Sequence, residues 1–314
     1  MPTDRSAPRV TVLGSYAKAI VITTERIPLA GETVLGRDYR QEFGGKGSDM
    51  AVQAARLGAD TSFVGVIGDD ALGREFLELM RAEAVDTTAV RSTAERSTGV
   101  GLIVKDDAAR NVIVVDLGAN ELFDADDVVA AGERVTGAAV VLAPLEIPLV
   151  TALHGMRVAH AAGAITVLNP APALRLTADL SDIDVLTPNQ TEARVLVGRA
   201  PDDEVDNAII ASELQAFGAR NVVITRGEEG VDVFTPERYV HVPACAVDVI
   251  DSNGAGDSFS AALAVGLAEG STLVEAAAFG NAAAALCCEG WETVPSYRDR
   301  AAVDAMLATT AVTA

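Results

Sequence analysis

One stretch of the chain reads Asp251-Ser252-Asn253-Gly254-Ala255-Gly256-Asp257-Ser258-Phe259, and a long apolar helical pattern follows it. Glycine lets backbone N–H groups turn toward a ligand, and the first turn of a helix carries unpaired N–H donors at the positive end of its dipole. The run Gly254-Ala255-Gly256 therefore predicts an anion-binding hole at a helix N-terminus. An ordinary capped helix after a glycine turn is the alternative, because Asp is a favoured cap.

Asp257 stands at the rim of this predicted hole. A carboxylate there can take a proton beside the place where negative charge gathers. Phosphoryl transfer to an alcohol needs that combination. Asp257 is therefore the candidate catalytic base, with Gly254, Ala255 and Gly256 as the candidate anion hole.

The bulk composition limits the classes of protein open to this chain. Its 314 residues are 49% hydrophobic, which suffices for a sizeable core, and the formal charge of −21 disfavours nucleic acid and anionic membranes as partners. Three cysteines without metal-ligand spacing indicate a reducing compartment. The sequence shows neither a signal-peptide core nor an apolar run long enough to span a membrane. We expect a soluble, cytoplasmic protein.

Short apolar runs alternate with longer amphipathic stretches through most of the sequence. The runs have the length and composition of buried parallel strands, and they cover residues 10–13, 61–67, 138–142, 165–168, 185–187 and 222–225. The helical patterns between them include residues 49–57, 72–84, 147–161 and 203–217. This alternation predicts an α/β fold with a doubly wound, mainly parallel sheet and helices on both faces.

Two regions break the alternation. Residues 17–43 and 88–116 contain β-branched, alternating stretches without an intervening helix, which predicts strands of a separate small sheet. Such a sheet would cover a cleft as a lid that excludes water during phosphoryl transfer. Two ordinary hairpins are the alternative. Because the sequence shows no repeats or low-complexity linkers, we predict a single domain over residues 1–314 that carries this lid.

A second glycine cluster reads Phe43-Gly44-Gly45-Lys46-Gly47-Ser48-Asp49, between a predicted lid strand and a helix. Paired glycines allow a hinge and a close approach of the backbone to a ligand. Lys46 and Asp49 bring opposite charges to the helix start. The spacing is not that of a P-loop, so a Walker-type nucleotide site is not supported. A helix-starting turn explains the cluster equally well.

Other polar residues follow predicted strands, where open α/β sheets bind ligands. Asn189 and Glu192 lie three apart at a helix start, so an amide and a carboxylate on one face could order Mg²⁺ through its waters. An Asn cap with a surface Glu is the alternative. Residues 225–230 form a glycine turn after a buried strand. Glu146 follows another strand and could accept substrate hydroxyls or cap a helix.

Together these segments resemble the ribokinase-like (PfkB) family of carbohydrate kinases, over nearly the whole chain. Several ordered motifs at compatible spacing are far more specific than one glycine turn. The stretches that carry the resemblance are Gly44-Gly45-Lys46-Gly47 with Ala51, Ala55-Arg56-Leu57-Gly58, Gly118-Ala119-Asn120, Asn169-Pro170-Ala171-Pro172-Ala173, Thr187-Pro188-Asn189 with Glu192, and residues 251–257.

The resemblance implies an ATP-dependent kinase in which Asp257 takes the proton of the attacking hydroxyl. It implies that the backbone of Gly254, Ala255 and Gly256 stabilises the transferring phosphoryl group. The residues implied for the ATP site are Asn189, Thr225, Arg226, Gly227, Gly230, Gly256 and Asn281. Mg²⁺ is expected near Asn189 and Glu192, and a possible K⁺ near Asp251 and Asn253. The candidate acceptor site comprises Gly45, Lys46, Gly47, Asp49, Glu146 and Asp257.

The chain departs from the family's pattern on the acceptor side. Where ribokinases usually read Gly-Ser-x-Asn-x-Asp, this sequence has Gly14-Ser15-Tyr16-Ala17-Lys18-Ala19, and Asp49 replaces the amide that normally follows the diglycine. A hydrogen bond to a charged group contributes roughly 1.5 to 3 kcal/mol, so losing two would weaken ribose binding about 10² to 10⁴-fold. A carboxylate at position 49 suits a ligand that is rich in donors or cationic. Alternatively, Lys18 neutralises Asp49 or receives an acidic substrate.

We therefore predict an ATP-dependent phosphotransferase that acts on a primary hydroxyl of a small sugar or sugar-like substrate. A nucleoside kinase on the same fold and a non-catalytic sugar-binding descendant are the alternatives. A nicotinamide dehydrogenase is not supported, because no Gly-x-Gly-x-x-Gly follows the first strand. An apolar outer face of the lid would need a partner, and members of the family often pair through their lids, so we expect a homodimer.

Overall fold

In the computed structural model, which describes residues 7–108 and 110–312, nine strands form a large sheet in the order β13-β12-β11-β10-β9-β8-β1-β4-β5. Neighbours from β11 to β5 pair in parallel, whereas β12 and β13 run antiparallel at one edge. The strands are β1 (Arg9–Leu13), β4 (Asp60–Gly68), β5 (Asp86–Thr93), β8 (Val140–Ala143), β9 (Ile165–Leu168), β10 (Val185–Leu186), β11 (Asn221–Thr225), β12 (Val231–Phe234) and β13 (Tyr239–Val242). The predicted doubly wound, mainly parallel sheet is confirmed.

Helices cover both faces of this sheet, and each face has its own hydrophobic core. Alternate strand residues serve the two cores: Val140 and Leu142 join one, and Val141 and Ala143 join the other. The first face carries α1 (Lys46–Arg56), α2 (Ala71–Ala82), α8 (Ala255–Ala268), α9 (Leu273–Cys287) and α11 (Arg300–Val312). The second carries α3 (Ala125–Ala131), α4 (Glu133–Thr136), α5 (Leu149–Ala161), α6 (Gln190–Leu196) and α7 (Asn207–Ala216). The short α10 (Thr293–Ser296) and the 3-10 turns η1 (Gly118–Leu122) and η2 (Gly227–Glu229) complete the described elements.

Most predicted helices begin and end close to the observed ones, and the largest difference concerns α7. The pattern at residues 203–217 predicted a helix four residues before the actual start at Asn207. Asp206 sets that start, because its side chain accepts a hydrogen bond from the Ala208 N–H at 2.7 Å. The acidic residues ahead of the cap share the polar character of a helix surface, which periodicity alone does not distinguish.

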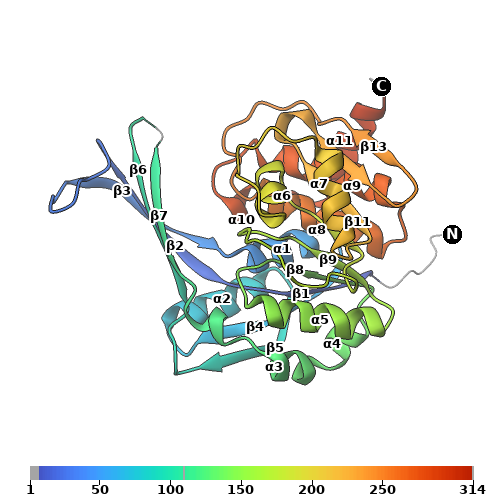
Figure 1. Cartoon of the computed structure of the whole chain (residues 1–314). Helices are drawn as coiled ribbons and strands as arrows, with labels where there is room; N and C mark the ends of the chain where they lie inside the picture. The colour runs from blue at the N-terminus through green and yellow to red at the C-terminus, as the bar shows by residue number, and fades with distance from the viewer. Residues whose placement is uncertain (1–6, 109, 313–314) are drawn as a thin grey trace.

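The small sheet has four strands in the order β3-β2-β6-β7 and projects from the body of the molecule (Figure 1). They are β2 (Ala17–Thr24), β3 (Gly36–Gly44), β6 (Gly99–Asp106) and β7 (Asn111–Asp116). The predicted second insert, residues 88–116, is wrong at its start, because β5 pairs with β4 in the large sheet. An edge strand alternates like a lid strand, so periodicity does not tell which sheet it joins.

Parts of two predictions fall on residues that the structure leaves undescribed. Residue 109 belongs to the predicted second insert, and residues 1–6 and 313–314 belong to the predicted single domain. The extent of that domain and the function of the small sheet as a lid remain predictions.

The helix α8 is buried on nearly all sides, between the central strands and α9. Such a helix is apolar all round, as the sequence Ala261 to Leu267 is. A methyl group on Gly280 of α9 would lie 2.8 Å from the ring of Phe259, so this glycine allows the two helices to pack closely. Asn169, which follows β9, donates a hydrogen bond to the Ser260 hydroxyl at 2.9 Å. The first turn of α8 is thereby held at the carboxyl ends of the central strands. Within the described residues, no helix combines the length and apolar character needed to cross a membrane.

Candidate active site

The first turn of α8 is shaped by two glycines with different surroundings. Gly254 precedes the helix in the left-handed region, with φ of +78°, and a methyl group there would lie 2.8 Å from the Tyr297 hydroxyl. By contrast, no described atom lies within 4 Å of the place where a methyl group on Gly256 would be. The turn is therefore packed tightly behind Gly254 and open in front of Gly256. This arrangement gives an anion access to the positive end of the helix.

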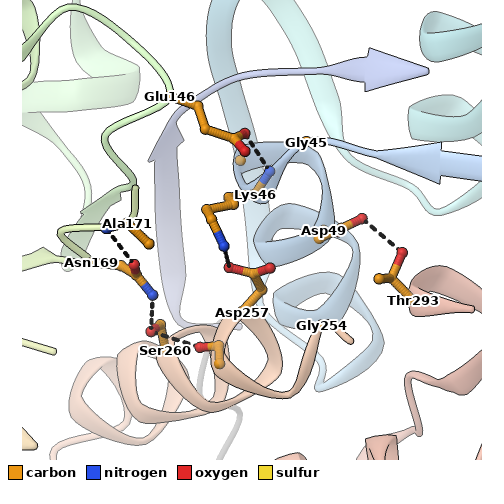
Figure 2. Close-up of polar contacts among 12 residues, drawn as sticks. Gly45, Lys46, Asp49, Glu146, Asn169, Ala171, Gly254, Asp257, Ser260 and Thr293 are labelled. Atoms are coloured by element: carbon orange, nitrogen blue, oxygen red, sulfur yellow. Dashed lines mark hydrogen bonds and ion pairs between the residues drawn. The ribbon is translucent and has the colours of Figure 1, made fainter. Parts of the chain in front are cut away.

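Asp257 occupies the third position of α8 and is only 6% exposed. Among the described residues its Oδ1 atom has no hydrogen-bond partner, and the Lys46 ammonium lies 3.8 Å from it (Figure 2). Burial raises the pKa of Asp257 to about 6, the Lys46 ammonium opposes this increase, and the Glu146 and Glu192 carboxylates add to it. Asp257 in turn raises the pKa of Lys46, so that the ammonium stays protonated. A carboxylate with a pKa near 6 is ionised at neutral pH and can still accept a proton in a reaction.

The second glycine cluster brings Lys46 to Asp257. Gly45 has φ of +91°, and a methyl group on Gly47 would lie 2.3 Å from the Ser15 nitrogen, so both positions need glycine for α1 to approach the end of β1. Glu146 fixes this approach: one oxygen, Oε2, accepts from the Lys46 N–H at 2.8 Å and from the Ser15 hydroxyl at 2.6 Å (Figure 2). Glu146 thus caps α1, which comes earlier in the chain, rather than a helix that follows it.

Asp49 lies on α1 and is 3% exposed. Its Oδ1 atom is 3.4 Å from the Thr293 hydroxyl (Figure 2). Burial raises the pKa of Asp49 well above its usual value, and Asp257 and Glu146 raise it further. The expected pairing of Lys18 with Asp49 is not formed, because the Lys18 ammonium lies 2.9 Å from Glu75.

The direction of Lys18 follows from the geometry of β2. Successive side chains of a strand point to opposite faces, so Lys18 leaves the face that Ala17 and Ala19 share. On the opposite face, Lys18 lies over the ring of Phe43, with 4.2 Å from Nζ to the ring centroid. The face of Ala17 and Ala19 therefore offers only methyl groups at these two positions.

A cavity of about 650 Å³ opens beside the first turn of α8. It brings together five of the residues predicted for the ATP site: Thr225, Gly227, Gly230, Gly256 and Asn281. Most of its other lining residues are small or apolar, and sequence reasoning missed them: Ala244, Cys245, Ala246, Val247, Val249, Phe259, Ala284, Ala285 and Cys288. No charge or motif marks these residues, since they belong to loops and helix faces that resemble ordinary core. An apolar wall of this kind suits a flat heterocyclic ring.

Arg226, by contrast, turns away from this cavity. Its guanidinium lies 3.2 Å from Asp232, which is 2% exposed, and it also pairs with Glu229. Asp232 is further held by Asn207 and Tyr239. The structure therefore places Arg226 in a network at the antiparallel edge of the sheet.

The two residue pairs expected near cations make local hydrogen bonds. Asn189 and Glu192 close a capping box at the start of α6, in which each side chain accepts from the other's N–H at 2.8 Å. The Glu192 carboxylate also raises the pKa of Asp257, so it lies near the same site. Asp251 accepts from the N–H and the amide of Asn253, at 3.0 and 3.2 Å. In the part of the chain that the structure describes, no three His, Cys, Asp or Glu side chains gather as a metal site.

Sequence reasoning also missed the residues that support the first turn of α8. The Ser260 hydroxyl donates to the Gly256 carbonyl at 2.9 Å, and Asn169 donates to Ser260 (Figure 2). On the other side, the Tyr297 hydroxyl lies 3.5 Å from the Gly254 carbonyl. Asn169 was quoted as part of a family motif, but nothing in its sequence neighbourhood indicated a contact with α8, about ninety positions later.

Comparisons with known proteins identify relatives of this chain. A model of the pfkB family of carbohydrate kinases matches residues 7–299. The chain is 36% identical to a ribokinase of Staphylococcus aureus (strain COL) over 281 residues, which cover 88% of this chain and 92% of that protein. It is 32% identical to a deoxyribokinase of Salmonella typhi over 253 residues, with 80% and 82% covered. The solved structure of Arabidopsis thaliana ribokinase complexed with ribose and ATP superposes with a TM-score of 0.87 at 30% identity, covering 96% of this chain and 99% of that one.

Proposed function

The chain belongs to the pfkB family of carbohydrate kinases, and we propose that Asp257 is the general base of its ATP-dependent phosphotransfer. The observation that carries this proposal is the position of one atom. Asp257 Oδ1 is buried without a hydrogen-bond partner among the described residues, in the same helical turn whose Gly256 lines the 650 Å³ cavity. This oxygen has an ion pair with Lys46 at 3.8 Å but no hydrogen bond, and a buried acceptor without a hydrogen bond is costly to maintain, which supports a ligand donor at this atom.

In the proposed reaction, Asp257 accepts the proton of a primary hydroxyl on the acceptor. The hydroxyl oxygen forms a bond to the γ-phosphorus of ATP, the bond from that phosphorus to the β,γ-bridging oxygen breaks, and ADP leaves with the electron pair. The N–H groups of Ala255 and Gly256, at the positive end of α8, stabilise the charge on the phosphoryl oxygens. Lys46 keeps Asp257 ionised between turnovers.

The variant Asp257→Asn tests the proposal. It keeps the shape of the side chain and removes its basicity, so kcat should fall by about 10² to 10⁴, the usual size of a general-base effect. Asp206→Asn is a matched control, because Asn also caps helices and Asp206 does not line the 650 Å³ cavity. If Asp257→Asn folds and turns over at the normal rate, Asp257 is not the base.

We also propose where cations bind, from side chains that offer oxygen ligands. Asn189 and Glu192 offer an amide and a carboxylate, which suit a Mg²⁺ ion that keeps much of its water shell, and the ion would neutralise charge on the phosphates of ATP. On the family resemblance, we propose that Asp251 and Asn253 lie at a K⁺ site. The variant Glu192→Gln should raise the Mg²⁺ concentration needed for half-maximal turnover. An unchanged requirement would remove Glu192 from this function.

The acceptor is proposed to be a small sugar-like molecule other than plain ribose. The relatives named above are a ribokinase and a deoxyribokinase, so a pentose-like size is supported. However, the acceptor side offers methyl groups at Ala17 and Ala19 and a carboxylate at Asp49. A panel of D-ribose, 2-deoxy-D-ribose, ketohexoses, polyols, amino sugars, sugar acids and nucleosides, with ATP consumption as the readout, tests this. Turnover confined to ribose at ordinary affinity would contradict it.

We also propose that the small sheet is a lid and pairs two copies of the chain. Leu102 and Val114 face each other in the register of β6 and β7, so they share one face, and both are exposed, as is Val112. An exposed apolar sheet face of this kind commonly marks an interface. Sedimentation velocity should show a dimer for the natural chain and a monomer for Leu102→Lys with Val114→Lys. A monomeric natural chain would refute the proposal.

A further inference from the structure

Thr293 contacts both halves of the candidate site. It begins α10, and its hydroxyl oxygen lies 3.4 Å from Asp49 Oδ1 and 3.3 Å from the carbonyl oxygen of Phe43, near the end of the lid strand β3 (Figure 2). The γ-methyl group of Thr293 lies against the anion hole, 2.9 Å from where a methyl group on Gly254 would be. One short side chain thus touches the acceptor side through its hydroxyl and the phosphate side through its methyl.

The segment that carries Thr293 is fixed from α1. Arg56 donates from Nη1 to the carbonyl oxygens of Val294 and Tyr297, at 2.6 and 2.9 Å. Gln53, one turn earlier on α1, donates to the Arg298 carbonyl at 3.0 Å. Because α1 also carries Asp49, these bonds set the distance between Asp49 and α10. Thr293 therefore has little freedom to follow a displacement of the anion hole.

The backbone just before Thr293 indicates that its position is imposed by these surroundings. Glu292 has φ of +65°, in the left-handed region that non-glycine residues rarely adopt. Local preference would place the chain elsewhere, so the contacts on either side must offset the strain. Strained positions of this kind cluster where function needs a fixed geometry.

We propose that Thr293 is a positioning residue that holds the acceptor site and the anion hole at a fixed separation. This inference rests on the proposed function, in which Asp49 binds the acceptor and the turn at Gly254 binds the phosphoryl group. Phosphoryl transfer needs the attacking oxygen in line with the phosphorus and about 3 to 3.5 Å from it. The hydroxyl of Thr293 fixes Asp49 for the acceptor, and its methyl group fixes the Gly254 turn for the phosphoryl group.

Two variants separate the contacts. Thr293→Val keeps a γ-methyl group beside Gly254 and removes the hydroxyl, whereas Thr293→Ser keeps the hydroxyl and removes the methyl group. The assay uses saturating Mg·ATP and the acceptor with the highest kcat/KM in the panel above. For Thr293→Val we expect KM for the acceptor to rise about tenfold with kcat within about twofold, because the hydrogen bond that orients Asp49 is lost. For Thr293→Ser we expect kcat to fall about tenfold with KM within about twofold, because a small displacement at reacting groups costs at least this much.

A merely structural role would give a different pattern. If both variants lower the melting temperature and change KM and kcat together, or if neither differs from Thr136→Val at an exposed threonine elsewhere, the inference is refuted. The variant Asp49→Asn separates a failure of the proposed acceptor site from a failure of the role of Thr293. If it raises the acceptor KM while Thr293→Val does not, the acceptor site stands and only the role of Thr293 falls. If Asp49→Asn leaves the acceptor KM unchanged, the proposed acceptor site fails and the role of Thr293 fails with it.

Discussion

The proposed phosphate side of the site is built mainly from backbone, whereas the proposed acceptor side is built from side chains. On the phosphate side, Gly254 and Gly256 shape the first turn of α8, and most of the cavity beside it is small or apolar. On the proposed acceptor side, the groups available are the Asp49 carboxyl and the methyl groups of Ala17 and Ala19. The phosphate chain of ATP is the same whatever the acceptor, so the proposed glycine turn does not depend on which acceptor is used. Acceptor side chains can change without disturbing that turn.

The variant Gly254→Ala should give the largest effect and would break this contrast if it were tolerated. A methyl group at φ of +78° would lie 2.8 Å from Tyr297 and 2.9 Å from Thr293, so the turn must move. Displaced oxyanion donors typically cost about 10² to 10³ in kcat, and we expect a loss of that size.

Gly163→Ala is the matched control for Gly254→Ala. Gly163 has φ of +91°, but no described atom lies within 4 Å of an added methyl group, so only backbone strain is introduced. This control should lose stability and keep its turnover. Equal turnover of the two variants would show that the turn at Gly254 is not an anion hole.

Changing the acceptor side alone would sharpen the comparison. Ala17→Asn combined with Ala19→Asp restores the two side chains of the ribokinase pattern, and KM for D-ribose should fall by about 10², the lower end expected for two hydrogen bonds to charged groups. KM for ATP should stay the same, because neither position lines the 650 Å³ cavity proposed for the nucleotide. Steady-state kinetics with both substrates checks this. A ribose KM that does not change would place the acceptor elsewhere.

Lys46→Met tests the connection between the two sides with a smaller effect. Removing an opposite charge 3.8 Å from Asp257 should raise the pKa of this carboxyl further above 6, by about one pH unit or more. Turnover at pH 7 should then drop, about twofold for a rise of one unit and about tenfold for a rise of two, and recover as the pH rises, because the base is active only when ionised. A loss of equal size at pH 8.5 would instead mean that Lys46 contacts the substrate directly.

The sequence predicts local features of this molecule better than contacts between distant segments. The sheet, α8 and the residues of the glycine turns follow from periodicity and backbone chemistry, which neighbouring residues determine. The directions of long side chains do not follow from these local patterns. Lys18 and Arg226 each turn toward a carboxylate, Glu75 and Asp232, that no local pattern connects to them.

Long-range contacts at the site were beyond sequence reasoning for the same reason. Thr293 meets Asp49 across 244 positions of the chain. Asp49 ends the second glycine cluster, but no motif marks Thr293. Likewise, the strand β5 reads like a lid strand because alternation reports a half-buried strand and not its partner. Sequence alone therefore indicates candidate groups for chemistry, and the fold decides which of them meet.

The most direct test of the account is the pH dependence of the chemical step itself. The rate constant of single-turnover phosphoryl transfer, measured by rapid quench between pH 5 and 8, should not change with pH above the pKa of Asp257. Because only the ionised carboxylate accepts the proton, the rate should fall about tenfold per pH unit below a pKa of about 6. The same limb should be missing in Asp257→Asn, at a much lower rate throughout. A natural chain without this acid limb, or a limb that persists in Asp257→Asn, would contradict the assignment of Asp257 as the base.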